Sequence, residues 1–112
     1  MKKIMTTFNN REKAAEAKFS HDQETAFKMM ARRNKLLGLW VAEHLGLSGD
    51  EADAYAREVV KSDFDRPGDE DVFEKVWADL QAKNVDLSEH RVRRHMTELL
   101  TEAERQVLEE TP

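Results

Sequence analysis

The apolar side chains of this chain recur at three- and four-residue steps in four separate stretches, a spacing that places them on one face of an α-helix. The longest stretch runs from about Asn10 to Leu45 and is followed by Gly46, a residue typical of a helix stop. Its stripe consists of Phe19, Ala26, Phe27, Met30, Leu37, Val41 and Leu45. No stretch shows the alternation of apolar and polar residues that is typical of a strand. The sequence therefore predicts an all-α fold.

Three shorter helices are predicted after the long one: Gly49 to about Lys61, about Asp69 to Ala82, and Ser88 to about Glu109. The connections between them are short, so neighbouring helices are expected to be roughly antiparallel, as in a four-helix bundle. Such a bundle predicts that Trp40 and Trp77 are at least partly buried.

Polar residues at the expected helix starts support these boundaries. Ser48 and Glu51 have the spacing of a capping box before the second helix. Either Asp86 or Ser88 can cap the fourth helix. The third helix begins with acidic residues, which the helix dipole favours at this end, namely Asp69, Glu70 and Asp71.

The first residues of the chain differ from the rest because their apolar stripe is thin and many charges surround it. Before Phe19 the stripe is reduced to Phe8, Ala14 and Ala15. A helix without an apolar face to pack is marginal in water. We therefore expect residues 1–18 to form a flexible N-terminal arm and residues 19–112 to form the four-helix domain.

The net charge of −5 hides an asymmetry along the chain. Residues 1–40 contain nine Lys or Arg and four Asp or Glu, a balance of +5, whereas residues 41–112 contain nine and nineteen, a balance of −10. A basic segment on an acidic body suggests that the segment contacts an acidic partner. A basic helix face that is merely solvated remains the alternative.

Several function classes are disfavoured by what the sequence lacks. The chain has no cysteine, so it has no disulfide, thiol nucleophile or thiolate metal ligand. It has no apolar run of the roughly 20 residues that a membrane span needs, and no phosphate-binding or nucleophile motif. The basic cluster at residues 28–35 lacks the stacking aromatics typical of a nucleic-acid groove. We expect a cytoplasmic, non-enzymatic protein without a cofactor, without nucleic-acid binding and without membrane insertion.

The stretch Asp63 to Glu74 has partial similarity to a calcium-binding EF-hand loop, with Asp, Gly and Glu at several ligand positions. Pro67 and Glu70 depart from that pattern, and the chain has no second loop to pair with it. The simpler interpretation is an acidic turn that caps the following helix. The four histidines are scattered and show no metal-binding spacing, so no metal site is predicted.

Three motifs in this order resemble those of a known family: Met5 to Phe19, Phe27 to Gly38 and Ser62 to Phe73. The family is the zeta subunit of alphaproteobacterial F-type ATP synthases, an ATPase inhibitor. The resemblance extends from about Met5 to Glu110. It implies a four-helix protein with a mobile N-terminal segment.

In that family the N-terminal segment inserts into the catalytic head of the synthase, which consists of alpha, beta and gamma subunits. It enters a catalytic interface between alpha and beta, where it blocks ATP hydrolysis while largely sparing synthesis. The resemblance therefore implies an inhibitory segment from about Met5 to Phe19, continuing toward His21. It also implies a protein held at the inner membrane through the synthase, and we expect a monomer when the protein is free.

The residues of this segment fit such a role independently. Phe8 and Phe19 are eleven positions apart, about three helical turns, so both lie on one face and can anchor it to a partner. Ala15 permits close approach, and charged residues can pair with groups on the partner. The expected contact residues are Phe8, Arg11, Glu12, Lys13, Ala15, Lys18 and Phe19. The alternative function is a free-standing helical bundle that binds a nucleotide or calcium.

Overall fold

The computed structural model describes the backbone of residues 2–65 and 68–110, and the side chains of residues 23–65 and 68–110. Four helices make up this part of the chain: α1 (Lys2–His44), α2 (Asp50–Asp65), α3 (Asp69–Ala82) and α4 (Glu89–Glu110). No strand occurs among the described residues. The predicted all-α, four-helix fold is confirmed.

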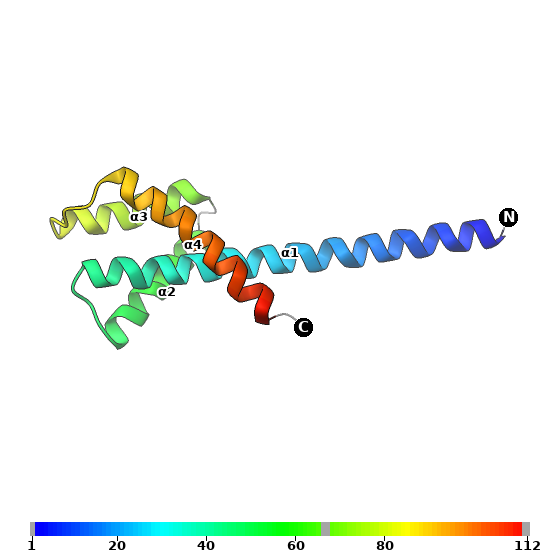
Figure 1. The fold of residues 1–112 in the computed structure, drawn as a ribbon, viewed down its shortest axis with the longest axis horizontal. Helices are drawn as coiled ribbons and strands as arrows, with labels where there is room; N and C mark the ends of the chain where they lie inside the picture. The colour runs from blue at the N-terminus through cyan, green and yellow to red at the C-terminus, as the bar shows by residue number, and fades with distance from the viewer. Residues whose placement is uncertain (1, 66–67, 111–112) are drawn as a thin grey trace.

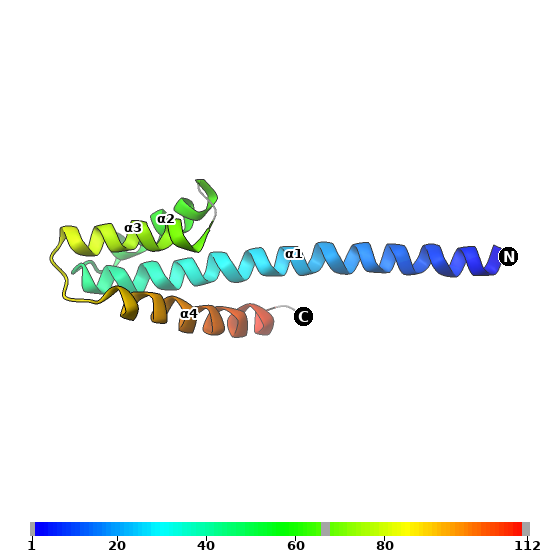
Figure 2. The same ribbon diagram turned by 90° about the horizontal axis from the view of Figure 1, so that it is seen from above.

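Helix α1 is the axis of the molecule, and its C-terminal half packs against each of the other three helices. Its N-terminal half extends well beyond them (Figures 1 and 2). Along the axis of α1, helices α2 and α4 run in the opposite direction and α3 runs in the same direction (Figure 2). Both α2 and α4 cross α1 obliquely (Figure 1). The fold therefore consists of a helical body and a single helix that projects from it.

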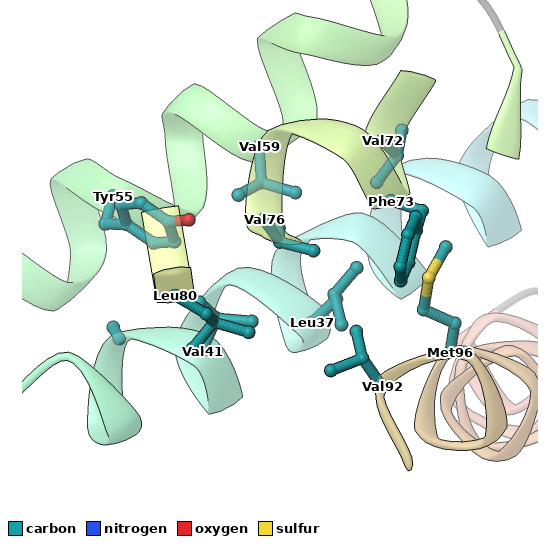
Figure 3. Close-up of a cluster of buried hydrophobic side chains, with 11 residues drawn as sticks. Leu37, Val41, Tyr55, Val59, Val72, Phe73, Val76, Leu80, Val92 and Met96 are labelled. Carbon is teal, nitrogen blue, oxygen red and sulfur yellow. The ribbon is translucent and has the colours of Figure 1, made fainter. Parts of the chain in front are cut away.

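All four helices contribute side chains to one core (Figure 3). Fully buried side chains come from each helix, for example Leu37, Val59, Val76 and Val92. Burying each such side chain stabilises the fold by roughly 1.5–3 kcal/mol. Trp40 and Trp77 pack against this core and are half-buried, as the sequence predicts.

The C-terminal ends of α1 and α3 use the same cap. Gly46, after α1, has a φ of 80°, and the Leu47 N–H donates to the Ala42 carbonyl at 2.9 Å. Asn84, after α3, has a φ of 54°, and an equivalent bond joins Val85 to Leu80 at 3.0 Å. Both are left-handed residues that close the last helical turn, and Gly and Asn tolerate this conformation best. The predicted stop at Gly46 is confirmed.

The N-terminal cap that the sequence predicts is present in α4 and absent in α2. Ser88 caps α4, since its Oγ accepts a hydrogen bond from the Arg91 N–H at 3.1 Å. The predicted capping box at Ser48 is wrong, because the Gly49 carbonyl accepts the first helical bond, from the Asp53 N–H at 3.1 Å. Gly49 has a φ of 58°, so the chain turns there and α2 begins at Asp50.

Two helices are longer than predicted, because α1 begins at Lys2 and α2 continues to Asp65. The predicted burial of the α1 stripe is wrong at Ala26 and Phe27, which are both exposed. The fully buried part of α1 begins at Arg33, among the described side chains. Helices α2, α3 and α4 cover α1 only from about that position onward, and this coverage decides which apolar residues are buried.

Candidate functional site

The projecting part of α1 contains every contact residue that the sequence predicts. The structure gives this segment a helical backbone, and the side chains of these residues lie outside the described ones. Their contact role, the mobility of residues 1–18 and the domain boundary at residue 19 therefore stay predictions. The predicted contact residues are Phe8, Arg11, Glu12, Lys13, Ala15, Lys18 and Phe19.

Two exposed aromatic rings lie where α1 leaves the helical body. Phe27 of α1 and Phe64 of α2 have ring centroids 5.3 Å apart, and they are 55% and 57% exposed. The sequence does not predict this pair, because the two residues are far apart in the chain and Phe27 belongs to a stripe that the helical spacing assigns to the core. Exposed aromatic clusters are typical of protein–protein contact sites.

Two adjacent pockets flank this aromatic pair. One, of about 460 Å³, lies between α1 and α2, and the other, of about 380 Å³, also reaches α4. Both pockets contain Lys35 and Val60, so they form one continuous surface. We call this the root surface and define it by its exposed aromatic and basic members, which are Phe27, Lys28, Lys35, Arg57, Lys61 and Phe64.

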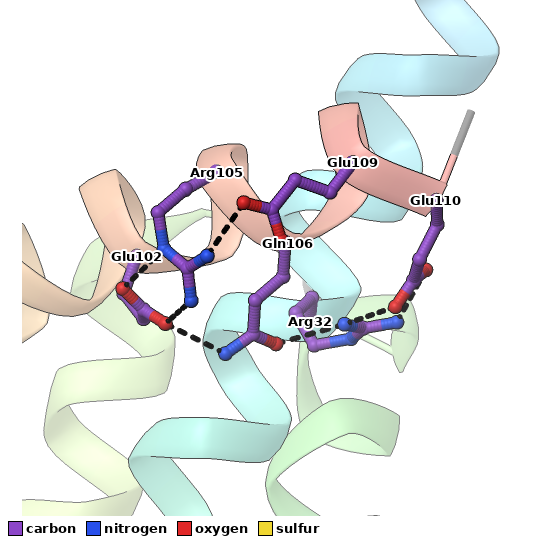
Figure 4. A network of polar contacts seen from close by, with 6 residues as sticks. All are labelled: Arg32, Glu102, Arg105, Gln106, Glu109 and Glu110. Carbon is purple, nitrogen blue, oxygen red and sulfur yellow. Dashed lines mark hydrogen bonds and ion pairs between the residues drawn. The ribbon is translucent and has the colours of Figure 1, made fainter. Parts of the chain in front are cut away.

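A polar network holds the end of α4 against α1 beside the root surface (Figure 4). The Arg32 guanidinium donates to Gln106 Oε1 and to Glu110 Oε2, both at 2.8 Å. Gln106 in turn donates to Glu102 Oε1 at 3.0 Å. The hydrogen bond from Arg32 lowers the pKa of Glu110, so that carboxylate stays ionised at neutral pH.

Glu102 also binds Arg105 on the exposed face of α4 (Figure 4). The hydrogen bonds that Glu102 accepts from Arg105, and then from Gln106, lower its pKa to about 2. Arg105 donates in addition to Glu109 at 2.8 Å. The last turns of α4 are therefore held by the bonds from Arg32 to Gln106 and Glu110 as well as by the burial of Ala103 and Val107.

The start of α3 is fixed by two arginines. Arg33 of α1 is 1% exposed, and its guanidinium lies 2.7 Å from an Asp69 carboxylate oxygen. Arg93 of α4 donates to both oxygens of Glu70, at 3.0 and 2.8 Å, and stacks over the Phe73 ring at 3.8 Å. These contacts join α3 to its neighbours and create no pair of nucleophile and base.

The acidic stretch after α2 does not form an EF-hand loop. Helix α2 continues through Asp65 and α3 begins at Asp69, whereas an EF-hand needs a 12-residue loop between its helices. The Asp63 carboxylate instead accepts a hydrogen bond from the Gly68 N–H at 3.2 Å. Among the described residues, no cluster of three or more His, Cys, Asp or Glu could hold a metal ion.

Two of the scattered histidines meet at Trp40. The ring centroid of His44 lies 4.7 Å from that of Trp40, and the centroid of His95, on α4, lies 4.1 Å from it. The four-residue spacing of Trp40 and His44 could have indicated the first contact. The second joins distant parts of the chain, and no signal in the sequence predicts it.

Within the described part of the chain, no helix is both long and apolar enough to span a membrane.

Comparison with known proteins finds one matching family model and a similar solved structure. A family model described as ATPase inhibitor subunit zeta matches residues 5–106. A solution NMR structure is 55% identical to this chain and superimposes with a TM-score of 0.66, covering 75% of this chain and 95% of its own. No curated protein matches the chain.

Proposed function

Because the chain belongs to the ATPase inhibitor subunit zeta family, we propose that it inhibits ATP hydrolysis by an F-type ATP synthase. In this proposal the N-terminal part of α1 inserts into the catalytic head, at an interface between alpha and beta subunits. The rest of the chain remains outside as a helical body. The partner is the assembled head of alpha, beta and gamma subunits.

The observation that supports this mechanism most directly is the projection of α1 beyond the other helices (Figures 1 and 2). A single helix of this kind can enter a cleft that a four-helix body cannot. Its sequence supplies aromatic anchors, Phe8 and Phe19, and basic residues that suit an acidic partner. Because such a helix is marginal in water, it gains order on binding, which suits reversible regulation.

Steric blockade needs no catalytic side chain in the inhibitor. Among the described residues, some ion pairs join two helices, as Arg33 and Asp69 do, and others lie within one helix, as Arg105 and Glu109 do. Family membership favours the inhibitor over the alternative, a free-standing bundle that binds a nucleotide or calcium.

The direct test is a titration of the matching purified catalytic head with the full chain. We expect the initial rate of ATP hydrolysis to fall to a low plateau, while the intact synthase in vesicles retains most of its synthesis rate. A chain that binds the head and leaves hydrolysis unchanged at saturation would disprove the inhibitory function.

A further inference from the structure

The root surface is an unusual combination of exposed groups for a protein with a net charge of −5. Its aromatic rings, Phe27 and Phe64, are each more than half exposed, although burial of such rings is favourable. Beside them, the two pockets contain four exposed Lys or Arg residues and two exposed carboxylates, Asp53 and Glu110. A local apolar patch with a basic rim is typical of a surface that another molecule covers.

Two of the basic groups of this rim are free to bind, whereas Lys28 and Lys35 lie near enough to Glu110 to help lower its pKa. Arg57 and Lys61 lie one turn apart on α2, both are exposed, and neither forms an ion pair with a residue that the structure describes. The two pockets contain only two carboxylates, Asp53 and Glu110. Glu110 is already held by Arg32, so a positive field remains.

We infer that the root surface is a second docking surface, which binds an acidic segment of the catalytic head with an apolar side chain directed at Phe27 and Phe64. This inference rests on the proposed function. The chain's own N-terminal segment is a poor occupant, because residues 2–19 carry five Lys or Arg and two Glu and would be repelled. An acidic partner satisfies both the rim and the aromatic pair.

The root surface lies close enough to the N-terminal segment for one partner to bind both at the same time. Phe27 lies nineteen residues after Phe8 on the same helix, a separation of about 28 Å at 1.5 Å per residue. One partner can therefore contact the projecting segment and the root surface together. Two linked contacts bind more tightly than either alone, so the root surface is expected to contribute affinity and the N-terminal segment to contribute inhibition.

The test compares full-length variants that carry the same change of charge. Arg57→Glu with Lys61→Glu reverses the rim, and Lys83→Glu with Arg91→Glu reverses two exposed bases elsewhere on the body. We expect the rim variant to raise the dissociation constant for the purified head by about tenfold at low salt, an effect that shrinks in high salt. The control should change it by less than about twofold. Phe64→Ser, at an exposed site, should weaken binding by about tenfold as well.

The rim variant should still inhibit fully at saturation, because its N-terminal segment is intact. If the rim variant and Phe64→Ser both bind the head as tightly as the unmodified chain does, the root surface is not a docking surface. The proposed inhibitory function is not affected by that result. If the unmodified chain does not bind the head, the proposed function fails too. Self-association of the unmodified chain that the rim variant loses, with equal head affinity, would assign this surface to a second copy instead. Circular dichroism verifies that each variant is folded.

Discussion

Gly38 of α1 packs directly on the backbone of α2 at Ala56. A Cβ atom placed on Gly38 would lie 2.6 Å from the Ala56 Cα and 3.1 Å from its Cβ. The two helices therefore approach more closely here than any side chain on α1 would allow. This contact fixes the crossing of α1 and α2, and the pocket that contains Arg57 and Lys61 lies along the same crossing.

Gly38→Ala should destabilise the protein, although the same change in an exposed helix stabilises by up to about 1 kcal/mol. Overpacking against a backbone atom costs about 1–3 kcal/mol, so we expect a net loss of about 1–2 kcal/mol in the free energy of unfolding. Urea titration followed by circular dichroism measures it. Ala54→Gly, at an exposed site on α2, is the control and should show only the ordinary helix-propensity cost. A stabilised Gly38→Ala protein would contradict the close approach.

The sequence predicts the elements of this fold better than their contacts. The bounds of α3 follow from local signals, and the structure confirms them. Of the two caps that the sequence allows for α4, Asp86 and Ser88, the structure shows Ser88. Arg33 belongs to a basic cluster whose charge predicts an exposed position. In the structure it is buried and binds Asp69, which is 36 residues away in the chain. Likewise, the exposure of Phe27 depends on where three other helices end. Local spacing does not determine such relationships, so the root surface could not be predicted.

Asp69→Asn should destabilise the body, because it removes the carboxylate that neutralises the buried Arg33 guanidinium. Leaving a buried charge unpaired costs about 3–5 kcal/mol. The Asp69 side chain is 62% exposed, so water can replace part of the interaction, and we expect about 1–3 kcal/mol. Glu74→Gln removes an exposed charge from the same helix and should have little effect. Equal unfolding midpoints for the two variants would show that Arg33 does not need Asp69.

Acid should lower the stability of the folded protein, and protonation of Glu102 should be one of the causes. Its pKa is lowered to about 2 by Arg105 and Gln106, so the folded state binds a proton less readily than the unfolded chain, whose Glu pKa is about 4.3. This contribution is complete above about pH 5 and is lost as the pH falls toward 2. Urea midpoints between pH 2 and 7 should fall less steeply for Glu102→Gln than for the unmodified chain. Identical slopes would exclude Glu102 as a source of the pH dependence.

Calcium should leave the fold and its stability unchanged. The acidic residues Asp63 and Asp65 belong to α2, so they cannot adopt the loop conformation of an EF-hand without unwinding that helix. Calorimetry should detect no binding in the range of sensor sites, and the thermal midpoint should be equal in calcium and in EDTA. A dissociation constant of about 10 μM or tighter would contradict this interpretation.

Deleting residues 1–19 should abolish inhibition of ATP hydrolysis and leave the helical body folded. Every core residue that the structure identifies lies between Leu37 and Val107, so the deletion removes none of this packing. It does remove Phe8 and Phe19, the two predicted anchors. The root surface remains, so weak binding to the catalytic head should persist after inhibition is lost.

A milder variant tests the two anchor side chains without shortening the N-terminal segment. Phe8→Ala with Phe19→Ala should weaken inhibition strongly, since a buried aromatic anchor contributes about 2–4 kcal/mol to an interface. Both proteins are titrated against the initial rate of ATP hydrolysis by the matching catalytic head, with circular dichroism as the folding control. Ala26→Ser, an exposed change farther along α1, should inhibit like the unmodified chain. If the truncated protein inhibits as strongly as the full chain, inhibition must arise from the helical body, because it then does not depend on the projecting segment.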